Sequence, residues 1–130
     1  MEKTIKYLIL LAILAFTIPF ILNSQTEKTI IEASFLMGNT SGFDLNPNEL
    51  TFGQITQNSS ASRAITITNS FNKQKEIHIR ASGEIKEYII VSENNFILNP
   101  NESKNITFSI YPTNTTQQQK YSGQIIITSK

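Results

Sequence analysis

The chain has 130 residues, no cysteine and a formal net charge of +1. Without cysteine it can form neither a disulfide framework nor a thiolate metal site. Setting aside the first 24 residues removes Glu2, Lys3 and Lys6 and leaves nine basic and nine acidic residues. A neutral chain of this kind lacks the basic surface that holds nucleic acid against salt. The composition favours a single domain with an uncharged polar surface of Asn, Ser, Thr and Gln.

The first 24 residues have the organisation of an export segment. Lys3 and Lys6 precede Tyr7–Leu22, an uncharged apolar run, and this order is typical of a Sec signal peptide or an uncleaved anchor. The run of 16 residues is shorter than the roughly 20 residues that a helix needs to cross a bilayer. We expect one N-terminal hydrophobic helix. It is either cleaved before Gln25 or kept as a membrane anchor, with the rest of the chain outside the cytoplasmic membrane.

Residues 25–42 are predicted to form a spacer and an extra strand. Thr29–Met37 alternates with period two, and one parity carries Ile31, Ala33, Phe35 and Met37. The glycines of Gly38–Gly42 predict a loop. Two interpretations follow for the strand. It is either the first strand of its own sandwich, or a donor strand that completes a sheet in a neighbouring subunit by strand addition.

Residues 43–130 consist of short alternating segments separated by turn residues. The predicted strands are Leu50–Ile55, Arg63–Asn69, Glu76–Ser82, Tyr88–Ser92, Phe96–Leu98, the alternating segment that ends at Tyr111, and Tyr121–Thr128. Gly53, inside the first of these, predicts a bulge or a close approach of two backbones. No segment after Leu22 has the apolar spacing of a helix.

The stretch Phe96–Tyr111 carries the clearest strand pattern. Its short first strand ends at Asn99–Asn101, where Pro100 fixes φ and the asparagines tolerate turn conformations. Ile106, Phe108 and Ile110 then alternate with polar residues. This period is typical of a half-buried antiparallel strand.

Together these segments predict the fold class. Short alternating strands that recur every 8–12 residues or so, with turn residues between them, are typical of a sandwich. We therefore predict an all-β fold, an immunoglobulin-like antiparallel β-sandwich. It has seven strands within residues 43–130, and Thr29–Met37 makes an eighth. The cysteine and tryptophan markers of antibody domains are missing, so the similarity is one of architecture.

Five segments also match a known pattern of strand ends and turns. They are Leu45–Ile55, Ser59–Asn69, Phe96–Lys104, Ile106–Ile110 with Pro112, and Tyr121–Ile125. Through them residues 44–128 resemble the exported Ig-like domains of archaea and bacteria, whose pattern is similar to that of the ASH/MSP-like sandwiches. The resemblance implies a sandwich without shared catalytic residues, and cytosolic members of that group bind partner proteins. In architecture alone, a strand ahead of the sandwich also resembles TasA-like and archaeal bundling fibre subunits.

The polar residues give no catalytic or metal-binding pattern. His78, the single histidine, is out of phase with Ile77 and Ile79 and is therefore predicted on the solvent face of its strand. A catalytic histidine needs a nucleophile or carboxylate within reach, and a metal site needs several ligands at matched spacing. Asp44 is the only aspartate, and the glutamates are scattered. We predict no enzyme activity, no cofactor, no metal and no small-molecule substrate.

The chain contains five sequons for N-glycosylation, at Asn39, Asn58, Asn101, Asn105 and Asn114. Four of them fall in predicted turns or loops, where a glycan can stand clear of the backbone. Asn105 begins a predicted strand on its outward side. The sequons therefore agree with an exported glycoprotein.

These features predict a non-enzymatic exported or membrane-anchored protein of the cell surface, structural or adhesive in role. Its partners would be the membrane, through the N-terminal segment, and other envelope proteins or identical subunits. One alternative is a filament subunit that assembles by donor-strand exchange through Thr29–Met37. Another is an envelope partner-binding or chaperone-like module that uses Tyr121–Thr128 as an open sheet edge, where Ile126 is apolar on the outer side.

Overall fold

The computed structural model describes residues 2–22, 26–39, 42 and 49–130. An N-terminal helix, α1 (Glu2–Leu22), precedes the strands. The strands are β1 (Glu27–Met37), β2 (Leu50–Ile55), β3 (Ala61–Thr68), β4 (Lys75–Gly83), β5 (Ile89–Val91), β6 (Phe96–Leu98), β7 (Ser103–Ile110) and β8 (Lys120–Ser129). A single 3₁₀ turn, η1 (Glu84–Glu87), lies between β4 and β5. The predicted helix and all eight predicted strands are confirmed.

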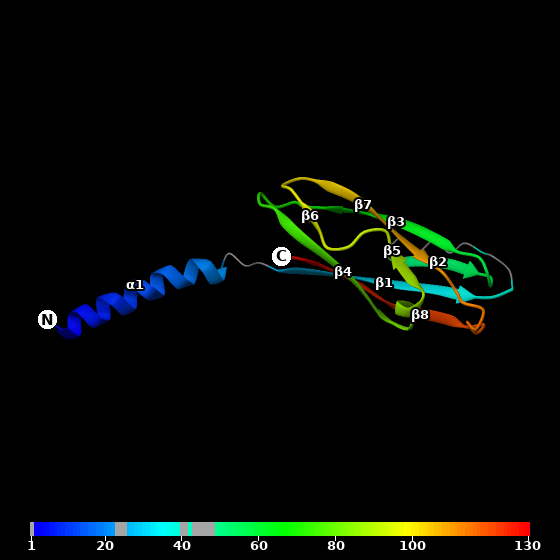
Figure 1. Ribbon diagram of the computed structural model, residues 1–130, viewed down its shortest axis with the longest axis horizontal. Helices are drawn as coiled ribbons and strands as arrows, with labels where there is room; N and C mark the ends of the chain where they lie inside the picture. The colour runs from blue at the N-terminus through cyan, green and yellow to red at the C-terminus, as the bar shows by residue number, and fades with distance from the viewer. Residues whose placement is uncertain (1, 23–25, 40–41, 43–48) are drawn as a thin grey trace.

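Helix α1 projects from one end of the strand domain (Figure 1). Its sequence is rich in leucine, isoleucine and alanine, and proline appears only near its end. The large apolar side chains described in its first half are exposed, namely Ile5, Tyr7, Leu8, Ile9, Leu10, Leu11 and Ile13. Among the residues that the structure describes, no helix has both the length and the hydropathy of a membrane span.

The strands form two sheets that pack face to face (Figure 1). One sheet has the order β2-β1-β8-β4-β6, and the other has the order β3-β7-β5. β1 lies between β2 and β8 and pairs with β8 over Glu27–Leu36. The first strand therefore completes a sheet of its own chain, inside the sandwich rather than ahead of it.

One strand pair differs from the prediction. β1 and β2 run parallel, with Ala33 opposite Leu50, so the prediction of a purely antiparallel sandwich is wrong at this pair. Side chains alternate in the same way in parallel and antiparallel strands, and the sequence pattern therefore could not distinguish the two. The predicted irregularity at Gly53 is confirmed, because the register shifts opposite Ser34–Leu36. Gly53 has a φ of 72°, which glycine adopts without steric cost.

The core lies between the two sheets and follows the predicted parities. The buried side chains are Ala33, Phe35, Met37, Leu50, Phe52, Ile55, Ile77, Ile79, Ile85, Phe96, Leu98, Ile106, Phe108, Ile110, Tyr121, Ile125 and Ile127. Ile65 and Ile67 point inward as predicted but are only half-buried, because β3 is the last strand of its sheet.

The turn η1 was not predicted from the sequence. Gly83 ends β4 with a φ of 77°, and the next turn places Ile85 in the core with no exposed surface. Beneath it, β4 and β8 approach each other at Gly123. A Cβ atom there would lie 2.6 Å from Ile85 Cγ2 and closer still to the Ser82 carbonyl oxygen. This crossing therefore requires glycine.

Candidate functional site

All five sequon asparagines, Asn39, Asn58, Asn101, Asn105 and Asn114, are exposed. Asn58 and Asn101 occupy turns with φ of 63° and 61°, a left-handed conformation that asparagine tolerates better than most residues. Asn105 lies on β7, opposite Thr66 of β3. The predicted placement of these residues is confirmed, and their modification stays a prediction.

Three sequons meet at one end of the sandwich. The Gln57 side chain, next to Asn58, donates a hydrogen bond of 3.4 Å to the main-chain oxygen of Asn114. The Gln118 side chain donates to the side-chain oxygen of Asn39. These bonds join the loops after β1, β2 and β7 at the end of the sandwich that is opposite α1 (Figure 1). We call this the distal end.

The distal loop that carries Asn114 is held from both sides. The Thr113 N–H donates to Thr116 Oγ1 at 2.8 Å, and the Thr116 N–H donates to the Thr113 carbonyl at 3.0 Å. The Tyr121 hydroxyl accepts from the Gln117 N–H at 3.1 Å and lies 3.2 Å from the Gln117 carbonyl. Thr116 is buried. The loop is therefore a fixed part of the surface.

An aromatic cluster supports the same loop from below. Phe35 and Tyr121 stack with ring centroids 4.9 Å apart, and Tyr88 packs edge-on against both rings. Burial raises the pKa of Tyr88, and its hydrogen bond with Tyr121 adds to this shift. Folding therefore favours the neutral form of this hydroxyl.

The outer face of the β3–β7 pair is a ladder of uncharged polar groups. Three cross-strand hydrogen bonds join its side chains: Ser62 to Ser109 at 2.7 Å, Thr66 to Asn105 at 2.7 Å, and Thr68 to Ser103 at 2.8 Å. We call these six residues the hydroxyl face. Cross-strand pairs of this kind stabilise a sheet by about 0.2–1 kcal/mol each. The Thr66 hydroxyl donates to Asn105 Oδ1 and so fixes the orientation of that sequon side chain.

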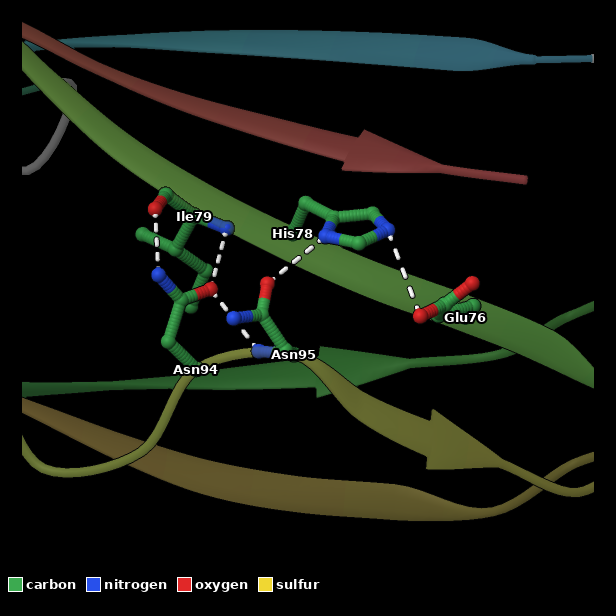
Figure 2. A network of polar contacts seen from close by, with 5 residues as sticks. All are labelled: Glu76, His78, Ile79, Asn94 and Asn95. Atoms are coloured by element: carbon green, nitrogen blue, oxygen red, sulfur yellow. Dashed lines mark hydrogen bonds and ion pairs between the residues drawn. The ribbon is translucent and has the colours of Figure 1, made fainter.

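The single histidine lies on the outer face of β4, as predicted. His78 Nδ1 is 2.7 Å from Asn95 Oδ1, and its Nε2 is 3.5 Å from Glu76 Oε1 (Figure 2). The polar side chains drawn in Figure 2 are the amides of Asn94 and Asn95, the Glu76 carboxylate and the His78 imidazole. These contacts orient the His78 ring on the outer face of β4.

Asn94 closes the edge of β4 beyond the point where β6 stops. β6 pairs with β4 only over Lys75–Ile77. At the next edge position, the Ile79 N–H donates to Asn94 Oδ1 at 2.7 Å, and Asn94 Nδ2 donates to the Ile79 carbonyl at 2.7 Å (Figure 2). The side-chain amide takes the place of a neighbouring strand. It thereby satisfies backbone groups that would otherwise be open to strand addition.

Sequence analysis did not identify two buried polar residues, Lys75 and Asn69. Lys75 is 1% exposed, with its Nζ 4.7 Å from the centroid of the Phe71 ring. Asn69 Nδ2 donates to the carbonyls of Lys73, Leu98 and Asn99. Lys75 has the same inward parity as Ile77, and Asn69 has the same inward parity as Ile67. This parity is the signal in the sequence that could have identified both buried residues.

The predicted donor-strand residues lie in their own sandwich. Ala33, Phe35 and Met37 are buried, and Ile31 is half-buried. The prediction that Tyr121–Thr128 forms an open edge is wrong, because β8 is the middle strand of its sheet, between β1 and β4. Ile125 and Ile127 of β8 are buried in the core.

A hollow of about 290 Å³ lies on the outer side of the β1–β2 pair. Its lining includes the hydroxyl residues Ser34 and Thr51, with Lys120 beside them. Within the described part of the chain, no three His, Asp or Glu residues are close enough to hold a metal ion.

Comparison of the chain with protein-family models, with curated proteins and with solved structures found no match.

Proposed function

We propose that this protein is a non-enzymatic module of the cell surface, exported by its N-terminal segment and built on one Ig-like sandwich. The observation that carries this proposal is the position of the sequons. All five asparagines are exposed, and three of them meet at the distal end, opposite α1. If α1 stays in place and is directed toward the membrane, the distal end faces outward. If it is removed, all faces of the sandwich are free.

The chemistry of the surface supports a structural or adhesive role. The hydroxyl face carries neutral groups whose hydrogen bonds are satisfied between neighbouring strands. The distal loops are tied together and anchored on Tyr121. Such a surface is rigid and uncharged, and glycans attached to it would add bulk and solubility without disturbing the core. The predicted partners are therefore other envelope components rather than a small substrate.

Mass spectrometry of the protein from the envelope fraction of producing cells tests the proposal. We expect either Gln25 or Met1 at the N-terminus, and added glycan mass on the sandwich. Asn58→Gln should remove the mass of one glycan, whereas Asn72→Gln, an exposed asparagine outside any sequon, should leave the mass pattern unchanged. Recovery of the unmodified chain from the cytosolic fraction alone would contradict the proposal.

A further inference from the structure

Most strand edges in this sandwich are short or blocked. β5 and β6 are the last strands on one side of their sheets, and each has three residues. Asn94 closes β4 beyond β6. On β2, the Gln54 N–H donates to the Gly42 carbonyl at 2.8 Å, and the Gly42 N–H donates to the Gln54 carbonyl at 3.1 Å. These are the devices by which proteins prevent association between sheet edges.

β3 is the exception. It is eight residues long and ends its sheet, and none of the described residues pairs with its outer side. Its register with β7 is continuous over Ala61–Thr68, without a bulge. It contains no proline, glycine or lysine, and Arg63 is its single charged residue. A long, regular edge of this kind is a template for another strand.

The hydrogen bonds around β7 show which backbone groups of β3 face outward. The Ser92 N–H donates to the Thr107 carbonyl on the β5 side, and the Asn69 N–H donates to the Glu102 carbonyl one residue beyond β3. Antiparallel residues alternate between bonded and non-bonded pairs. The residues that bond β7 are therefore Ala61, Arg63, Ile65 and Ile67. The N–H and C=O groups that face the open edge belong to Ser62, Ala64, Thr66 and Thr68.

We propose that this edge pairs with β3 of a second copy of the chain, antiparallel about a two-fold axis at Ile65. In this register Ala64 lies opposite Thr66 of the second copy, and Ser62 lies opposite Thr68. Every outward N–H and C=O of both edges then has a partner. The two three-stranded sheets become one continuous sheet, and the hydroxyl face extends across it.

Three features favour a second copy over another occupant. The half-buried Ile65 side chains of the two copies meet at the axis and cover each other. Arg63 lies opposite Ile67 of the second copy, so the two positive charges are not paired. Residues 25–130 carry equal numbers of basic and acidic groups, and long-range repulsion between two copies is therefore small.

Charge variants at Ala64 test the pairing. This side chain is exposed on the outer face, and in the proposed dimer it lies diagonally across the axis from Ala64 of the second copy. Sedimentation of the full-length chain in detergent should show a dimer that depends on protein concentration. Ala64→Lys and Ala64→Glu should each weaken dimerisation by about twofold to fivefold, and an equimolar mixture of the two should restore it. α1 is identical in all these proteins, so association through the helix would not respond to the charges.

Ala64→Pro provides a second test that removes an outward N–H without touching the bonds to β7. It should weaken the dimer at least about tenfold, whereas Ala64→Thr, which keeps the N–H, should leave it intact. Circular dichroism checks that each variant folds. If Ala64→Pro does not fold, the test rests on Ala64→Lys and Ala64→Glu. A wild-type chain that stays monomeric at every concentration would overturn the proposal, even if it bound another protein. So would a dimer that is unchanged by both Ala64→Lys and Ala64→Pro.

Discussion

Replacement of Gly123 by alanine tests the close crossing of β4 and β8 beneath η1. The added Cβ atom would lie 2.6 Å from Ile85 Cγ2 and closer still to the Ser82 carbonyl oxygen. Neither neighbour can move freely. Ser82 is held by backbone pairing with β8, and the Ile85 side chain is completely buried.

The expected cost follows from these contacts. Overpacking a core by one methyl group costs about 1–3 kcal/mol, and a clash with backbone belongs at the upper end of that range. Alanine also restricts the unfolded chain, which offsets about 0.4–1 kcal/mol. The net loss should be about 2 kcal/mol. For a domain of this size it corresponds to a fall in the melting temperature of about 10 °C.

Thermal and urea unfolding of the full-length chain measure this loss. Gly42→Ala is the matched control, since a Cβ atom there would meet only Gln54 Cβ, at 3.7 Å, and should change stability little. If the free energy of unfolding of Gly123→Ala lay within about 0.5 kcal/mol of the wild-type value, the close approach of the two strands would be refuted.

Three further predictions concern the edge, the aromatic cluster and the first strand. Asn94→Ala leaves the backbone groups of Ile79 unpaired and should lower the free energy of unfolding by about 1–2 kcal/mol. It should also speed aggregation, as measured by light scattering. Unchanged stability would rule out the edge-closing role of Asn94. The pKa of Tyr88 is raised on folding by burial and by Tyr121, so stability is lost as pH rises above about 10. Tyr88→Phe should reduce this loss, as urea midpoints at neutral and alkaline pH would show. Deletion of residues 25–37 should unfold the chain by circular dichroism, because it removes a strand that is paired on both sides; a folded monomer that no longer assembles would instead favour the donor-strand alternative.

The parities of the strands could be predicted from the sequence because burial on one face imposes period two locally. Ile106, Phe108 and Ile110 face the core for this reason. Gly53 could be predicted as an irregularity because only glycine takes its positive φ without cost.

The order and direction of the strands depend on long-range contacts that no local period encodes. The parallel β1–β2 pair and the central position of β8 therefore became visible only in the structure. Of the candidate site, the exposure of four sequons followed from turn residues, and that of Asn105 followed from the parity of its strand. The meeting of Asn39, Asn58 and Asn114 at one end depends on how three loops close over the sandwich.

The compartment of the sandwich is the central claim, and labelling of intact cells tests it most directly. Because the chain has no cysteine, Gln119→Cys introduces a single exposed thiol in the distal loop, and the wild-type chain provides the blank. A maleimide that cannot cross membranes should label the variant fully before the cells are broken. Labelling only after lysis would place the sandwich inside the cell and contradict the proposed function.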